Sequence, residues 1–341
     1  MALLPNPIVL QRADPFVLRD GDSYLFTGSY PAYDRITLRR SPTLAGLQAA
    51  GEHVIWRKHE SGTGAMSELI WAPEIHRVNG QWVIYFAAAH TTEIHPTADT
   101  FQHRVFALTC DDEDPISGTW TERGQVDTGM ETFALDATTF VHTDGHQYLI
   151  WAQQDLAIEG HSNLYIARMA NPWTLETKPV MLSKPELDWE KVRFIVEEGP
   201  AVLRHGDKIF VTFSASGTGP EYAMGMLTAD ADADLLDPSS WTKSPEPVFA
   251  SDETVRQFGP GHNSFTTTPD GDDVLVYHCR NYVEILGDPL FDPNRHARIG
   301  LISWREDGTP DFGTPQMDTR FTPATTEVLP ADGRLDVRDD L

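Results

Sequence analysis

The chain has 341 residues, of which 40% are hydrophobic and 23% are charged, a composition typical of a globular protein with a substantial core. Its 51 acidic residues outnumber its 26 basic residues, so the formal net charge is −25, spread along the whole chain. Such a surface repels phosphate backbones and anionic lipids, and we therefore expect neither a nucleic-acid partner nor a membrane partner.

The N-terminal stretch MALLPNPIVLQRADP has no basic residues ahead of its apolar run, and prolines interrupt that run. It therefore lacks the pattern of a secretory signal peptide, and no apolar stretch approaches the ~20 residues of a membrane-spanning helix. Cys110 and Cys279 lie far apart without metal-ligand spacing, which predicts two buried free thiols, with one disulfide as the alternative. Together these features predict a cytoplasmic protein.

Five segments along the chain repeat one pattern, in which a polar head residue starts a short strand, a turn containing glycine follows, and an apolar strand returns. In chain order the segments are ADPFVLRDGDSYLF, WAPEIHRVNGQWVIYF, LDATTFVHTDGHQYLIW, EEGPAVLRHGDKIFVTF and GPGHNSFTTTPDGDDVLVY. Their head residues, Asp14, Glu74, Asp136, Glu198 and His262, are 60 to 64 positions apart.

A third and sometimes a fourth strand follows in each unit, and helical periodicity is essentially absent. Four strands repeated five times predict a single all-β domain over residues 1–341, folded as a five-bladed β-propeller. The alternative is a pair of β-sandwiches, which would not require such even spacing. Residues 318–341 follow the last unit as a C-terminal extension that either closes a blade or covers an edge.

The first strand of each propeller blade lines the central channel, so the five head residues would form a ring at one mouth. An aspartate before proline, such as Asp14, is usually only a turn residue. Four acids and one imidazole on a common axis are costly, however, because like charges raise one another's pKa. Channels that serve only the fold are filled with small and apolar side chains instead, so the ring predicts a functional site.

At these residues the chain resembles glycoside hydrolase family 43, the five-bladed propeller arabinofuranosidases, β-xylosidases and arabinanases. ADPFV, WAPE, LDATTF, EEGP and GPGHNSF carry the resemblance, which extends from about residue 7 to about residue 305. It implies an inverting hydrolase in which Asp14 is the general base, Glu198 the general acid and Asp136 the carboxylate that orients the acid and tunes its pKa. Glu197 competes with Glu198, and the family pattern of Glu directly before Gly-Pro selects Glu198.

The resemblance also implies residues that bind substrate. Trp71 in WAPE would form an aromatic wall for the terminal sugar, with Tyr30 and Phe258 as further candidates. For each of these aromatic residues, the alternative role is packing within a blade. Glu74 takes an acidic family position near the substrate.

In the stretch DPNRHAR, Arg295 aligns with a family arginine that touches substrate hydroxyls, and Arg298 is the second choice. His262 matches a channel histidine that in many relatives contacts a central Ca²⁺ ion, often through waters. Its alternative role is a hydrogen bond within the ring. Because the sequence has no EF-hand-like calcium loop, the Ca²⁺ expectation rests on the resemblance alone, and no organic cofactor is expected.

The stretches FSASG and DPNRHAR are most similar to those of the exo-acting α-L-arabinofuranosidases. We therefore expect release of terminal α-L-arabinofuranose from arabino-oligosaccharides or from arabinan, a plant cell-wall polysaccharide. β-Xylosidases and endo-arabinanases share the three carboxylates and stay open as alternatives. The long polar segment over residues 90–102 favours exo action by closing one end of the channel, and the lack of a second module of ~150–200 residues argues against a xylosidase.

Other classes of propeller fit the sequence less well. A sugar-binding propeller without activity would not need all three carboxylates. A protein-binding propeller of the WD type would show Gly-His and Trp-Asp repeats, which are missing. Propellers that cleave fructans with retention place their nucleophile in Asn-Asp-Pro-Asn-Gly, whereas Asp14 lies in Ala-Asp-Pro-Phe. The sequence leaves the oligomeric state open.

Overall fold

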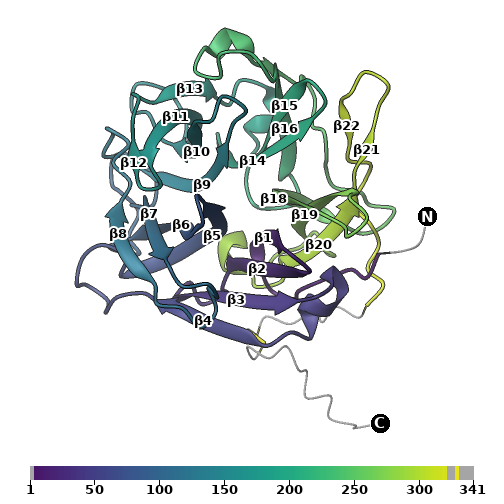
Figure 1. Ribbon diagram of the computed structural model, residues 1–341, viewed down its shortest axis with the longest axis horizontal. Coiled ribbons are helices and arrows are strands. Elements are labelled where there is room, and N and C mark those ends of the chain that lie inside the picture. The colour runs from purple at the N-terminus through teal and green to yellow at the C-terminus, as the bar shows by residue number, and fades with distance from the viewer. Residues whose placement is uncertain (1–3, 321–326, 330–341) are drawn as a thin grey trace.

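The computed structural model describes residues 4–320 and 327–329, and in these ranges the chain is built almost entirely of β-strands. Five antiparallel sheets surround a central axis (Figure 1), which confirms the predicted five-bladed β-propeller. Within the described ranges, none of the helices is long and apolar enough to span a membrane. Cys110 and Cys279 are buried and free, as expected.

Each blade begins with the strand nearest the axis and continues outward. The first two blades contain β1 (Ala13–Asp20), β2 (Ser23–Ser29), β3 (Arg35–Ser41) and β4 (Glu52–Arg57), then β5 (Glu68–Val78), β6 (Gln81–Ala89), β7 (Arg104–Cys110) and β8 (Thr121–Gln125). The third blade contains β9 (Ala134–Val141), β10 (Gln147–Gln153) and β11 (Asn163–Asn171), with β12 (Thr174–Leu175) and β13 (Val180–Ser183) both paired to β11.

The fourth blade contains β14 (Glu197–His205), β15 (Lys208–Ala215), β16 (Ala223–Asp230) and β17 (Thr242–Lys243), and the fifth contains β18 (Phe258–Thr267), β19 (Asp273–Arg280) and β20 (His296–Leu301). A small hairpin of β21 (Ser303–Trp304) and β22 (Pro310–Asp311) follows. The helical turns are the 3₁₀ segments η1 (Leu44–Gln48), η2 (Asp188–Glu190), η3 (Pro238–Ser240) and η4 (Pro289–Phe291).

The N-terminal segment closes the ring by pairing with the last blade. The Ile8 N–H donates to the Ala297 carbonyl at 2.8 Å, and the Ala297 N–H donates to the Val9 carbonyl at 2.9 Å, so this segment covers the outer edge of β20. An uncovered strand edge exposes unpaired backbone groups. Here the N-terminal segment and the last blade satisfy each other's backbone hydrogen-bonding groups.

The described part of the C-terminal extension lies at the same seam. Arg298 forms an ion pair with Asp318 at 2.7 Å, the Thr319 N–H donates to the Asn6 carbonyl, and the Leu329 N–H donates to the Gln11 side chain. Residues 321–326 and 330–341 of the predicted extension lie outside the described residues.

Five hydrophobic clusters fill the five interfaces between neighbouring blades. Strands buried on both faces explain why the second strand of each unit is a continuous apolar run such as WVIYF. Large aromatic side chains dominate these interfaces, and each buried Phe contributes about 1.5–3 kcal/mol to stability. These layers hold the inner strands rigidly around the axis.

The inner strand of every blade carries the same β-bulge, in which two residues lie opposite one residue of the second strand. The first residue of each bulge has a positive φ, between 28° and 58°, and a bulge of this kind redirects the adjacent side chains. The equivalent positions are Asp14, Ala72, Asp136, Gly199 and His262.

This alignment corrects the expected ring of heads in two blades. Glu74 lies two residues beyond the bulge position Ala72, and Glu198 lies one residue before Gly199. The five head residues therefore do not lie at one height on the axis. In these two blades the acidic residue of the sequence repeat does not coincide with the bulge position of the structure.

Candidate active site

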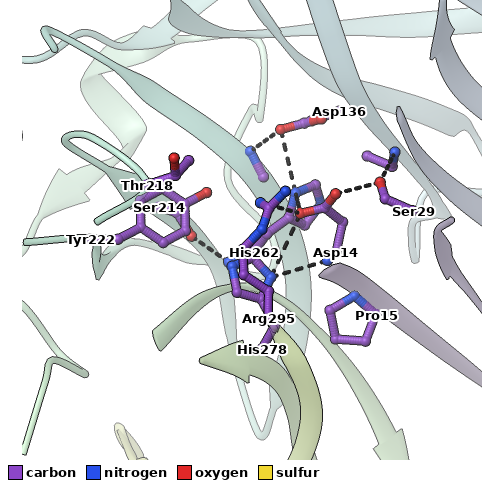
Figure 2. Close-up of polar contacts among 12 residues, drawn as sticks. Asp14, Pro15, Ser29, Asp136, Ser214, Thr218, Tyr222, His262, His278 and Arg295 are labelled. Carbon is purple, nitrogen blue, oxygen red and sulfur yellow. Dashed lines mark hydrogen bonds and ion pairs between the residues drawn. The ribbon is translucent and has the colours of Figure 1, made fainter. Parts of the chain in front are cut away.

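A pocket of about 370 Å³ opens at the end of the channel where the inner strands begin. Asp14, Asp136 and Glu198 line it together with His262 and Arg295, so three of the predicted acids share one cavity. Figure 2 shows Asp14 and Asp136, from the first and third blades, converging with His262 and Arg295 of the fifth blade. The outer walls are mainly apolar and come largely from loops within blades, between β6 and β7, β15 and β16, and β19 and β20, with residues 193–196 contributed by the loop between the third and fourth blades.

Asp14 is held by groups from three other strands and one loop. Its backbone N–H donates to Nδ1 of His278 at 3.0 Å, and Ser29 Oγ donates to its Oδ2 at 2.5 Å. Its other oxygen, Oδ1, lies 3.5 Å from His262 Nδ1 and 3.8 Å from an Arg295 nitrogen (Figure 2). Burial and the positive charge of Arg295 hold the pKa of His278 well below its usual range, which keeps that ring neutral and able to accept.

Asp136 lies on β9, the inner strand of the third blade. Its Oδ2 accepts a hydrogen bond from the Gly199 N–H at 3.1 Å and lies 3.4 Å from His262 Nδ1. Burial, followed by the negative charge of Asp14, raises its pKa well above the usual range. Nδ1 of His262 thus lies between the carboxyl groups of Asp14 and Asp136. The amide of Gly199, the residue that follows Glu198, connects Asp136 to the strand that carries Glu198.

Glu198 has the properties of a proton donor at neutral pH. Tyr222 Oη donates to its Oε1 at 2.7 Å. Burial and the nearby negative charge of Asp136 raise the pKa of Glu198 to about 8, outweighing the opposing effect of the Tyr222 hydrogen bond. The carboxyl group therefore keeps its proton at pH 7 while it faces the pocket.

Glu197 points away from the pocket, because neighbouring residues of a strand face opposite sides. Its Oε1 lies 2.6 Å from Lys243 Nζ and accepts from Ser183 Oγ at 3.0 Å. Lys243 also contacts Glu190 at 3.0 Å, and both glutamate side chains are fully buried. Of the two candidate acids, only Glu198 lines the pocket.

An aromatic wall closes one side of the pocket. Trp71 stacks on the His103 ring with centroids 3.8 Å apart, and the edge of Phe101 packs against it. Tyr33, which the sequence analysis did not single out, contacts Trp71 edge-on and accepts a hydrogen bond from Arg295 at 2.8 Å. Among the described residues, Trp71 Nε1 has no hydrogen-bond partner, so this donor is available to a ligand.

Three predicted substrate-binding residues do not line the pocket. Tyr30 lies between two guanidinium groups, those of Arg12 and Arg35, at 4.6 and 4.4 Å from its ring centre. Phe258 is buried at the start of β18 and is not among the residues that line the pocket. Glu74, beyond its bulge, contacts His76 at 3.0 Å, deeper in the channel.

Of the two candidate arginines, Arg295 lines the pocket, whereas Arg298 is buried against Asp318. Arg295 precedes β20 directly, and its guanidinium reaches both Tyr33 and Asp14. A planar guanidinium with several donors is well suited to sugar hydroxyls.

The residues around His262 do not fit a directly ligated metal ion. Among the described residues, no group of three or more His, Cys, Asp or Glu side chains is arranged to hold one. Ca²⁺ requires six to eight oxygen ligands, whereas Nδ1 of His262 faces Asp14 and Asp136 with the Arg295 cation nearby. An ion reached through waters stays a prediction.

The chain matches proteins of known family and structure. The sequence model described as glycosyl hydrolases family 43 matches residues 4–310. A Streptomyces avermitilis protein named extracellular exo-α-(1→5)-L-arabinofuranosidase is 50% identical over 92% of this chain and 64% of its own length, and a Streptomyces chartreusis protein of the same name is 52% identical over 83% and 84%. The crystal structure of an α-L-arabinofuranosidase from Lactobacillus brevis superposes with a TM-score of 0.91 at 56% identity, over 93% of this chain and 98% of that one.

The chain thus spans less than two thirds of the Streptomyces avermitilis relative. The names of the two Streptomyces relatives also correct the expected cytoplasmic location, because both proteins are described as extracellular. Location depends on targeting signals, which the composition of the folded domain does not encode.

Proposed function

The chain belongs to glycosyl hydrolase family 43, and from this premise we propose that it is an inverting, exo-acting α-L-arabinofuranosidase. Its substrates would be arabino-oligosaccharides or arabinan, from which it releases terminal α-L-arabinofuranose. The observation that carries the proposal is the contrast between two carboxyl groups of one pocket. Glu198 is kept protonated by burial, whereas Asp14 accepts a hydrogen bond and lies beside a guanidinium.

In this mechanism Asp14 takes a proton from a water molecule while the water oxygen bonds to the anomeric carbon. Glu198 gives its proton to the glycosidic oxygen as the bond between that oxygen and the anomeric carbon breaks. Because water enters opposite the departing group, the anomeric configuration inverts. Asp136 acts on Glu198 by raising its pKa and by holding the Gly199 amide.

Exo action is supported by the shape of the pocket. Ile94, Asp99, Thr100 and Phe101, all from the polar segment over residues 90–102, line its wall. A wall at this place blocks one end of the channel, so a chain terminus fits better than the middle of a polysaccharide. The names of the relatives, which specify exo-α-(1→5)-L-arabinofuranosidases, support the choice of sugar and linkage.

The proposal is tested by incubating the protein with α-1,5-arabino-oligosaccharides, linear arabinan, xylo-oligosaccharides and aryl glycosides. We expect arabinose as the product from the first two, with the β-anomer appearing first in an NMR time course. The Asp14→Asn variant should lose at least about 10²-fold in kcat while keeping its fold. Mainly arabino-oligosaccharide products, xylose release, or the α-anomer formed first would overturn the corresponding part of the proposal.

A further inference from the structure

Two buried ion pairs lie at equivalent places in the first and fourth blades, outside the pocket and unused by the mechanism above. Glu197, two residues before the bulge position of the fourth blade, lies 2.6 Å from Lys243 Nζ of β17. Arg12, two residues before the bulge position Asp14, lies 2.6 Å from Glu52 at the start of β4. Each ion pair therefore connects the segment where the inner strand begins to the outermost strand of the same sheet.

The equivalent position is uncharged in the other three blades, where Ile70, Ala134 and Pro260 occupy it. The two blades with an ion pair are those that carry the proposed base and the proposed acid. A buried ion pair adds little stability over apolar side chains of similar volume, because removing both charges from water costs about as much as their attraction returns. Stability alone therefore does not explain these two ion pairs, whereas a fixed distance and direction between the joined strands does.

In the fourth blade, the ammonium group of Lys243 contacts three acceptors. Besides Glu197, it contacts Glu190 at 3.0 Å and donates to the Lys184 carbonyl at 2.8 Å, and the lysine side chain is only 18% exposed. Lys184 and Glu190 both belong to the loop over residues 184–196, which joins β13 to β14. One ammonium group thus connects β17, this loop and the first residue of β14.

The backbone of Glu197 is fixed together with its side chain. Its N–H donates to the Ser162 carbonyl at 3.2 Å, and Ser162 Oγ donates to its carbonyl at 2.9 Å. Ser183 Oγ donates to its side chain at 3.0 Å. Because neighbouring residues of a strand face opposite sides, these contacts fix the backbone from which the Glu198 side chain extends into the pocket.

We propose that Lys243 is a positioning residue for the reaction: by fixing Glu197, it directs the carboxyl group of Glu198 toward the glycosidic oxygen. This inference rests on the proposed function, in which Glu198 gives its proton to that oxygen. Proton transfer requires the acid to lie within about 2.6–3.2 Å of the oxygen, and a catalytic group must be held within about 0.5 Å of its productive place. Glu198 lies between an irregular loop and a bulge, so regular strand pairing alone does not fix it.

The experiment measures the ratio of kcat on two substrates that depend differently on the acid. α-1,5-Arabinobiose needs a proton on its leaving oxygen, whereas 4-nitrophenyl α-L-arabinofuranoside releases a stabilised phenolate that needs little protonation. For Lys243→Met we expect kcat on arabinobiose to fall about ten- to 100-fold and kcat on the aryl glycoside to fall less than about threefold. Because the same folded molecules act on both substrates, the ratio does not depend on how much of the variant is folded.

Two further variants act on the same contact. Lys243→Arg keeps the cation and should bring the ratio back toward that of the unaltered protein. Glu197→Ala removes the contact with β14 but leaves Lys243 paired with Glu190, and it should reproduce the change in the ratio. It also supplies the measurement if Lys243→Met does not fold.

Arg12→Met is the matched control, because it breaks the corresponding ion pair in the blade of the proposed base. Both substrates need the water that Asp14 activates, so both kcat values should fall together. Lys208→Met removes a surface ion pair with Asp230 in the same sheet as Glu198 and should leave both values unchanged. A ratio for Lys243→Met within about threefold of that of the unaltered protein, or an equal change of the ratio in Arg12→Met, would overturn the positioning role. Failure of the unaltered protein to cleave either arabinoside would instead overturn the proposed function.

Discussion

The raised pKa of Glu198 predicts that this residue lowers the stability of the folded protein as the pH rises. In the unfolded chain a glutamate titrates near 4.5, whereas in the pocket the pKa of Glu198 is about 8. Between these values the folded state binds more protons than the unfolded state, so the free energy of unfolding decreases with pH. The full difference of about 3.5 pH units corresponds to at most about 5 kcal/mol, an upper limit because water in the pocket screens the charge.

Glu198→Gln removes the ionisable group but keeps the side-chain shape and an acceptor for Tyr222. We therefore expect the variant and the parent to be equally stable at pH 4.5, and the variant to become more stable as the pH approaches 8. Urea unfolding at pH 4.5, 6, 7 and 8 measures this difference directly. Burial also raises the pKa of Glu197, to about 7, so Glu197→Gln should change the stability difference mainly below pH 7, whereas the difference for Glu198→Gln should continue to change up to pH 8. A stability difference that is constant or decreases with pH would refute the reasoning and, with it, the protonated state of Glu198.

Three further predictions concern the surroundings of the acid. Asp136→Asn removes a negative charge beside Glu198 and should move the basic limb of the pH profile of kcat to lower pH; an unchanged or higher limb would contradict this. Lys243→Met leaves Glu190 and Glu197 buried without their cation and should cost about 3–5 kcal/mol in urea unfolding at pH 7, less at pH 5 where Glu197 is protonated; equal losses would exclude the ionic explanation. A calcium ion held through waters predicts that chelation lowers the melting temperature and that added Ca²⁺ restores it, whereas an unchanged melting curve in metal-free protein would argue against the ion.

The propeller could be predicted from the sequence because each blade is a local unit of strand, turn and strand. Those units repeat the same hydrophobic pattern, and the pattern follows from burial on both faces of the sheets. The convergence of Asp14, Asp136 and Glu198 followed from the same repeat, since equivalent positions of a propeller meet at one end of the channel. These features depend on short-range order, which a sequence displays directly.

The position of Glu74 could not be obtained in the same way. A bulge shifts the register by one residue without interrupting the apolar pattern, so the spacing of acidic residues gives no sign of it. The signal that was available is proline, which follows the bulge residue in Asp14-Pro15, Ala72-Pro73 and Gly199-Pro200. Proline tolerates this place because the extra residue of a bulge makes no ladder hydrogen bond.

The sequence also could not show that Tyr33, rather than Tyr30, lines the pocket. The two tyrosines are three residues apart in the loop after β2, and the sequence around each of them is similarly aromatic and polar. Tyr33 reaches Arg295 and Trp71 because its backbone adopts a positive φ of 50°, while Tyr30 is retained between Arg12 and Arg35. Both placements depend on contacts between residues that are distant along the chain.

The repeated bulge explains how one backbone feature can place similar side chains in different chemical environments. In the fourth blade the bulge position is Gly199, with φ +58°, and a Cβ atom there would lie 2.9 Å from the His262 ring. The proposed acid therefore cannot occupy the bulge position and lies one residue earlier, where Glu198 contacts Tyr222. The amide of Gly199 is left to bind Asp136, so the nearest carboxyl neighbour of the acid is itself held in place. A single-residue offset between blades thus separates the proposed proton donor from the carboxylates Asp14 and Asp136, which share His262.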